Sequence, residues 1–123
     1  MLEAYSTNVT VTANGALPFN STVIEKGCTA VLTSPTTIQL NKCGVYMVAC
    51  GASSATSNTI QLSKNGVIQP QTISTGTSPS FVTLVQVDKN NTACCCSSPV
   101  TLNVIVTSAG TLTNADIVVT KVC

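Results

Sequence analysis

Hydrophobic and polar residues alternate along much of the chain with the two-residue period of a β-strand. The stretch KCGVYMVACGASSATSNTIQLSKNG, residues 42–66, holds two such runs, at 45–50 and 59–63, around a short polar loop. It ends in Asn65-Gly66, a pair that tolerates the positive φ of a type I′ hairpin turn. We therefore expect residues 67–73 to form the next strand across that turn.

Three of the expected strands are apolar on both faces. In the run at 45–50, Val45, Met47 and Ala49 point one way, and the residues between them, also apolar, point the other way. The runs at 81–87 and 116–122 share this character. In a small antiparallel protein, such a strand needs cover on both sides, one from the sandwich and one from another sheet or subunit.

Shorter runs complete the pattern. We expect strands at 9–13, 30–33, 37–40 and 100–106, the last with Leu102 and Val104 facing inward. Leu17-Pro18-Phe19 is interpreted as an edge or the start of a strand, because proline cannot donate to a central ladder. About ten short strands, separated by turn signals and without helical periodicity, predict an all-β sandwich or barrel. The 123 residues are expected to form one domain, 1–123.

Four motifs follow one another in a recognisable order: Leu17-Pro18-Phe19-Asn20, Cys43-Gly44-Val45-Tyr46, Ile60-Gln61-Leu62 before Asn65-Gly66, and the closing run at 115–122. Their order resembles the tumour-necrosis-factor-like and complement-type globular-head jelly roll. The resemblance is strongest to the small heads of collagen-like spore-surface proteins and of bacteriophage fibre or head-decoration proteins. It implies a homotrimer in which the first, central, sixth and last strands form a sheet around the threefold axis.

The resemblance and the two-faced strands together predict a trimer interface drawn from the central, sixth and last strands. Its predicted members are Tyr46, Val48, Phe81, Val85, Val118 and Val122. Because Gly44-Val45-Tyr46 matches the family's Gly-x-Tyr opening of the central strand, the resemblance also implies a buried Tyr46 ring with a hydrogen-bonded hydroxyl.

Composition excludes several functions. The chain has five lysines, four acidic residues, no arginine, no histidine and a net charge of +1. Without a basic field or an arginine fork, we expect no nucleic-acid binding. No apolar run reaches the roughly 20 residues that span a bilayer, and the N-terminus shows no signal-peptide pattern, so no membrane association is expected. Scattered carboxylates and the absence of histidine argue against an enzyme.

Seven cysteines are the remaining candidates for chemistry, and their odd number leaves at least one thiol free or paired between chains. Consecutive Cys94, Cys95 and Cys96 point to alternate faces and lack C-x-x-C spacing, so neither a metal nor any other cofactor is expected. Cys28 is open to pairing with Cys43, and either also suits core packing. The cross-linking candidates are Cys28, Cys43, Cys94, Cys95, Cys96 and Cys123.

Two functions remain in view. The first is a structural or adhesive surface module, a trimeric jelly-roll head that decorates a phage capsid or fibre or a spore surface. Its partners would be itself and a capsid, fibre or coat protein, and its location would be the virion or the extracellular spore surface. The second is a head domain that binds a host-surface glycan or a receptor through the polar loops expected at 52–58 and 72–80.

Overall fold

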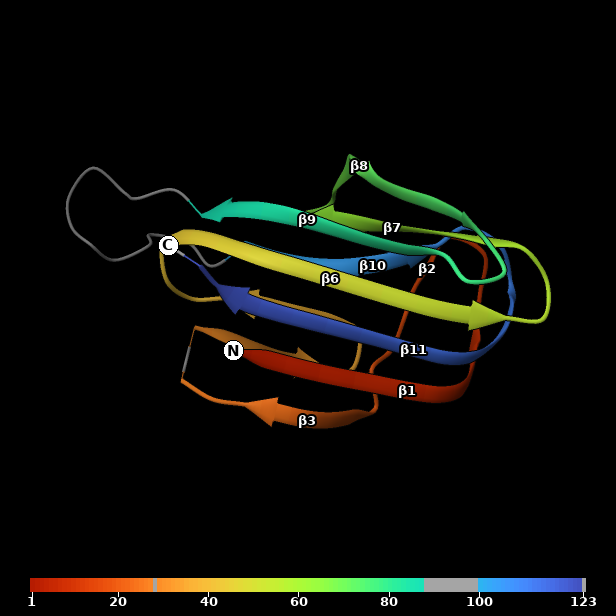
Figure 1. Cartoon of the computed structure of the whole chain (residues 1–123), viewed down its shortest axis with the longest axis horizontal. Helices are drawn as coiled ribbons and strands as arrows, with labels where there is room; N and C mark the ends of the chain where they lie inside the picture. The colour runs from red at the N-terminus through yellow and green to blue at the C-terminus, as the bar shows by residue number, and fades with distance from the viewer. Residues whose placement is uncertain (28, 88–99, 123) are drawn as a thin grey trace.

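The computed structural model describes residues 1–27, 29–87 and 100–122, and within them the chain forms eleven strands and no helix (Figure 1). The strands are β1 (Leu2–Val11), β2 (Gly15–Ala16), β3 (Ser21–Glu25), β4 (Ala30–Ser34), β5 (Thr37–Leu40), β6 (Gly44–Ser54), β7 (Asn58–Lys64), β8 (Val67–Gly76), β9 (Ser80–Val87), β10 (Val100–Val106) and β11 (Gly110–Lys121).

The strands form two antiparallel sheets packed face to face. The first sheet has the order β3-β1-β11-β6-β9 and lies toward the viewer in Figure 1. The second sheet has the order β4-β5-β10-β7-β8, with β2 paired to β10. Chain neighbours such as β6 and β7 lie in opposite sheets, which is the crossing connectivity of a jelly roll. The predicted all-β jelly-roll sandwich is confirmed, and the strands expected at 9–13, 45–50, 81–87 and 116–122 share one sheet.

The core fills the space between the sheets with alternate residues of each strand. In β10, Leu102 and Val104 are buried as predicted, while Thr101 and Asn103 face outward. In β9, the buried residues begin with Phe81 and recur at every second position. Full burial of one such side chain contributes roughly 1.5–3 kcal/mol, so a core to which eight strands contribute accounts for most of the stability.

Strand β1 begins at Leu2, well before the expected start at residue 9. Leu2, Ala4 and Ser6 face inward, and so do Val9 and Val11, so the inward parity changes once along the strand. Asn8 causes the change: its φ is 51°, and it is left out of the pairing with β11. The register with β11 is the same on both sides of Asn8, so the irregularity adds no residue to either strand, but it hides the alternation from a strict two-residue pattern.

The Asn65-Gly66 turn forms as predicted. The two residues have φ values of 52° and 84°, and Lys64 pairs with Val67 across them. Asn14 likewise has a φ of 58°, and the Gly15 amide donates to the Thr12 carbonyl at 3.0 Å. Asn65-Gly66 thus sets the register between β7 and β8. Asn14-Gly15 instead turns the chain from β1 in the first sheet to β2, which pairs with β10 in the second.

The Leu17-Pro18-Phe19 segment lies outside the strands, which corrects its expected role as an edge strand. Its backbone is nevertheless paired: the Leu17 amide donates to the Val104 carbonyl and the Phe19 amide to the Pro35 carbonyl, each at 2.7 Å. Leu17 and Phe19 are buried, so the segment closes one side of the core as the chain passes from the second sheet to the first.

Candidate assembly surface

The outward face of the first sheet carries a continuous band of apolar side chains. The register places Val118 of β11 beside Ala49 of β6, and Ala49 beside Val82 of β9. In the next row, Met47 pairs with Leu84. Residues paired on one face of adjacent strands lie about 5 Å apart and contact one another. We call this band the apolar patch; its members are Val45, Met47, Ala49, Val82, Leu84 and Val118.

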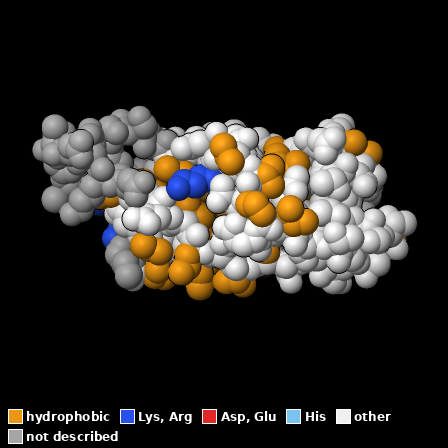
Figure 2. Space-filling model, turned by 90° about the horizontal axis from the view of Figure 1, so that it is seen from above, with side chains coloured by type: hydrophobic (Ala, Val, Ile, Leu, Met, Phe, Trp, Pro, Cys, Tyr) orange, Lys and Arg blue, Asp and Glu red, His pale blue; other side chains and the backbone are white. Residues whose placement is uncertain are grey.

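Part of this apolar patch is strongly exposed. Val82 is 69% and Leu84 62% exposed, and the other members are half-buried by one another. Figure 2 views the sandwich from its β8–β9 side, and hydrophobic side chains gather along its lower left margin, where the first sheet faces outward. Contiguous exposed apolar surface of this kind is typical of a protein–protein contact.

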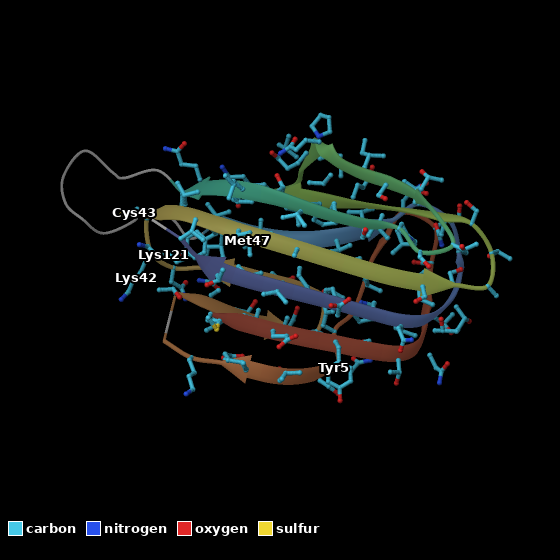
Figure 3. All side chains as sticks on the ribbon, viewed as in Figure 1. Tyr5, Lys42, Cys43, Met47 and Lys121 are labelled. Atoms are coloured by element: carbon cyan, nitrogen blue, oxygen red, sulfur yellow. The ribbon has the colours of Figure 1, made fainter. Side chains whose placement is uncertain are left out.

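Charged groups lie at the margins of the apolar patch. Glu3 pairs with Val118 from the β1 side. Lys42, Cys43 and Lys121 lie at the end of the sheet where β6 begins, whereas Met47 lies further along β6 (Figure 3). Within the paired rows of β11, β6 and β9 that form the patch, no residue is charged. A second copy that covered these rows would therefore bury no unpaired charge there.

Four predicted interface residues lie on the inward face instead. Tyr46, Val48, Phe81 and Val85 fill the core between the sheets, with exposures of 0, 0, 7 and 4%. Their assignment to a subunit contact is therefore wrong, because the sandwich already covers them. Periodicity separates the two faces of an apolar strand without saying which face is inside.

Two predicted interface residues do reach the surface. Val118 faces outward within the apolar patch and is half-buried by its neighbours. Val122 is exposed just beyond β11, where its amide donates to the Val45 carbonyl at 2.8 Å. The predicted interface did not include the other outward residues of the apolar patch on these strands, Met47, Ala49, Val82 and Leu84. The aromatic residues could have indicated the inward faces, because Tyr46 and Phe81 are the largest side chains of β6 and β9 and both are buried.

The buried ring and hydrogen-bonded hydroxyl expected for Tyr46 are confirmed. Its ring is fully buried, and its hydroxyl lies 2.7 Å from the Lys42 carbonyl and 3.3 Å from the Thr29 carbonyl. The hydroxyl thus fixes the chain just before β6 and leaves no buried polar atom unsatisfied at this point.

The described cysteines lie at two different depths. Cys50 is buried within β6, and burial raises the pKa of its thiol well above the ordinary value, with a further contribution from the negative charge of Asp116. Cys43 is half-buried immediately before β6. Cys28, Cys94, Cys95, Cys96 and Cys123 lie outside the described residues. The thiol state that Cys50 favours is neutral, which suits packing rather than nucleophilic chemistry.

Neither a metal-binding group nor a membrane-crossing helix is found in the part of the chain that the structure describes. There, no three histidine, cysteine or acidic residues come together. Over the same residues, no helix is long and apolar enough to cross a bilayer.

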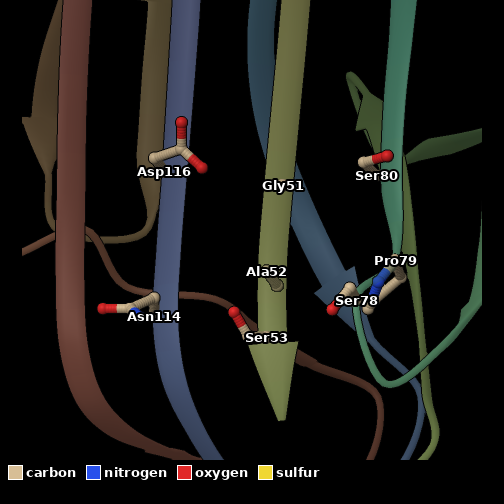
Figure 4. Close-up of a pocket in the computed structure, with 8 residues that line it drawn as sticks. All are labelled: Gly51, Ala52, Ser53, Ser78, Pro79, Ser80, Asn114 and Asp116. Carbon is tan, nitrogen blue, oxygen red and sulfur yellow. The ribbon is translucent and has the colours of Figure 1, made fainter.

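A small hollow opens on the outward face of the first sheet, beyond the apolar patch (Figure 4). It measures about 280 Å³ and is lined by Gly51, Ala52, Ser53, Ser78, Pro79, Ser80, Asn114 and Asp116. Figure 4 shows Asp116 of β11 on one side of Gly51 and Ser80 of β9 on the other.

The polar loops expected at 52–58 and 72–80 are mostly strand. Residues 52–54 continue β6, and residues 72–76 belong to β8, so only short turns remain. These turns are joined to each other: the Ala52 amide donates to the Pro79 carbonyl at 3.0 Å, and the Ser54 amide donates to the Thr77 carbonyl at 2.8 Å. The expected ligand-binding loops are therefore not formed as such, but residues of both ranges, among them Ser53 and Ser78, line the hollow.

The chain is similar to solved structures of one fold. The globular domain of zebrafish complement 1qA matches 99% of this chain and 96% of its own at 10% identity, with a TM-score of 0.77. Murine APRIL matches 98% of both chains at 10% identity and a TM-score of 0.64. Rabbit GITRL matches 100% of this chain and 95% of its own at 12% identity and a TM-score of 0.59.

These identities show a shared fold. The chain has the jelly roll of the C1q globular heads and of tumour-necrosis-factor-like domains, as the order of its motifs predicted. No protein-family model and no curated protein matches the sequence.

Proposed function

We propose that this domain is a homotrimeric surface module whose subunits associate through the apolar patch. The observation that carries the proposal is the uncharged band of Val45, Met47, Ala49, Val82 and Leu84, joined by Val118, on a sheet whose other face already fills the core. Aliphatic surface removed from water contributes about 25 cal/mol per Å², so covering this band favours association.

A threefold arrangement suits a subunit that associates through one apolar face. Each subunit presents the same sheet to a common axis, and the closed ring leaves no copy of the patch uncovered. The expected trimer of the sequence interpretation is retained, but its contacts are moved from Tyr46, Val48, Phe81 and Val85 to the residues that alternate with them.

We further propose that the trimer acts as a structural or adhesive head on a phage capsid or fibre or on a spore surface, bound to a capsid, fibre or coat protein. Two features support a role based on shape and durability. The described strands leave few long connections, and the chain carries only nine charged residues, five lysines and four acids. The proposal includes no catalytic step and no cofactor.

Light scattering on two matched variants tests the assembly. Val82→Lys places a charge in the apolar patch, and Val67→Lys places the same charge on an equally exposed valine of the second sheet, 64% against 69%. Burying an unpaired ammonium costs several kilocalories per mole, so Val82→Lys should dissociate the trimer. Val67→Lys should keep the wild-type mass.

The wild-type protein is expected at three times its chain mass of 12.6 kDa. A wild-type monomer at micromolar concentration would overturn the assembly proposal. An unchanged trimer in Val82→Lys would also overturn it, and so would equal dissociation of both variants. Either result would mean that the subunits do not associate through the apolar patch.

A further inference from the structure

Gly51 occupies a position in β6 where the backbone does not require glycine. Its φ lies outside the positive range, unlike those of Gly44 and Gly76. A glycine inside a strand weakens it and often marks a place where another group approaches closely. The absence of a side chain at Gly51 therefore suggests that another group occupies the space above it.

The missing side chain keeps the hollow open. A Cβ atom at Gly51 would lie 3.3 Å from Asp116 Oδ1 and 3.9 Å from the Ser80 Cβ. Asp116, Gly51 and Ser80 are direct neighbours in the register of β11, β6 and β9. The resulting space of about 280 Å³ is close to the lower limit of small-molecule sites, enough for one ring rather than an extended ligand.

Of the described residues that line the hollow, Asp116 alone carries a charged side chain. It makes no hydrogen bond or ion pair with any other described residue. A carboxylate accepts several hydrogen bonds, and the hydroxyls of Ser53, Ser78 and Ser80 both donate and accept. An ammonium group would bind the carboxylate but not the serine hydroxyls. A ligand with several hydroxyl groups would form hydrogen bonds on both sides of the hollow.

An aromatic residue stands next to this polar set. Tyr5 pairs with Asp116 from β1, on the side away from Gly51, and is 41% exposed (Figure 3). Its amphipathic ring offers an apolar face to the C–H side of a sugar ring that extends past Asp116.

We propose that the hollow binds a saccharide, with one sugar ring over Gly51 whose hydroxyl groups donate hydrogen bonds to the Asp116 carboxylate, and an adjoining ring stacked on Tyr5. The hollow lies beyond the apolar patch, so this inference goes beyond the proposed assembly and does not depend on it. The occupant is a neutral, hydroxyl-rich ligand, and contact with a single ring implies weak binding of monosaccharides.

Amide chemical-shift mapping on the labelled full chain tests the site with a panel of neutral monosaccharides and disaccharides. At least one sugar should shift the amides of Gly51, Ser80 and Asp116, with a dissociation constant on the order of 1 mM for a single ring. The same titration on Val82→Lys should give the same shifts, so that failure of the trimer and failure of the sugar site are distinguished.

Two variants and a matched control sharpen the test. Gly51→Val fills the hollow, and because valine favours strands more than glycine does, the fold should be retained. It should abolish binding. Asp116→Asn removes the charge with little change in shape and should weaken binding roughly tenfold or more, since hydrogen bonds to a charged acceptor are the stronger ones. Glu25→Gln makes the same change at an exposed position of β3, outside the hollow, and should bind like wild type.

Several outcomes would overturn the proposal. They are no shift with any sugar, shifts that map away from Gly51, binding that survives both hollow variants, and a preference for simple amines over sugars in the same titration.

Discussion

The outward faces of the two sheets differ, although both sheets pack on the same core. On the second sheet, the outward residues are mostly polar and bind one another: the Asn103 amide donates to the Thr36 carbonyl at 2.6 Å, and the Thr59 and Thr75 hydroxyls lie 2.7 Å apart. On the first sheet, the outward residues of the apolar patch are aliphatic or methionine. Polar groups that are satisfied in water need no cover, whereas an aliphatic band does. Among the described residues, the uncharged apolar band that we propose as the subunit contact therefore lies on the first sheet.

The first sheet is itself divided along its length. Its apolar patch covers the rows at Met47 and Ala49, and the next row along β6, at Gly51, is the polar hollow with Asp116. The proposed subunit contact and the proposed saccharide site thus lie on the same face of the sheet. The boundary lies between Ala49 and Gly51, two residues apart on the same strand.

The largest effect is expected from a pair of lysine substitutions on opposite faces of the first sheet. Val48 is fully buried, so Val48→Lys buries an unpaired charge at a cost of several kilocalories per mole and should unfold the domain. Val118 faces outward in the apolar patch, so Val118→Lys should leave a folded subunit that no longer associates. Circular dichroism and light scattering separate the two results. A folded Val48→Lys subunit would place that face at the surface and would reverse the comparison.

A smaller effect is expected from pH, through the buried thiol of Cys50. Burial raises the pKa of Cys50 in the folded state. In the unfolded chain, the thiol is expected to titrate near the ordinary pKa of cysteine, about 8.5. Above that pH, the unfolded state releases a proton that the folded state keeps, so stability falls as pH rises. The loss is about 1.4 kcal/mol for each pH unit above the unfolded pKa.

Denaturant unfolding between pH 7 and 10.5 measures this effect, with Cys50→Val as the matched control. Valine fills the same apolar site without a titrating group, so the difference in stability between the two proteins should change with pH by about this slope. A stability difference that stays constant across this pH range would show that the Cys50 thiol ionises as readily in the folded protein as in the unfolded chain, and so is not shielded from water.

Much of the fold could be predicted from the sequence because the strand signals are local. The asparagine-glycine turns, the alternation in β10 and the two-faced runs of β6, β9 and β11 each depend on a few neighbouring residues. Strand β3 was missed because its residues are mostly exposed and give no alternation. The start of β1 was missed because the inward parity changes at Asn8, a residue with a positive φ.

The surface sites could be predicted less well, because they depend on which face of a strand is inside. Val82 and Val85 have the same chemical character, yet one is 69% exposed and the other 4%. Only the packing of Phe81 and Tyr46 against the second sheet decides between them. The hollow was invisible for a related reason, since Gly51, Asp116 and Ser80 are brought together by register between three strands distant in sequence.

The smallest effect is expected on the outward face of the second sheet, at Thr101. Its amide donates to the Asn65 side-chain oxygen at 2.9 Å, and its hydroxyl lies 3.3 Å from the same atom. Thr101→Lys keeps the backbone bond and loses only the longer one, so stability should fall by no more than about 1 kcal/mol. The assembly should be unchanged, in contrast to Val118→Lys. Denaturant unfolding and light scattering measure both. Dissociation of the Thr101→Lys protein would mean that the polar face also contacts a subunit, and the difference between the two sheets would then have another cause.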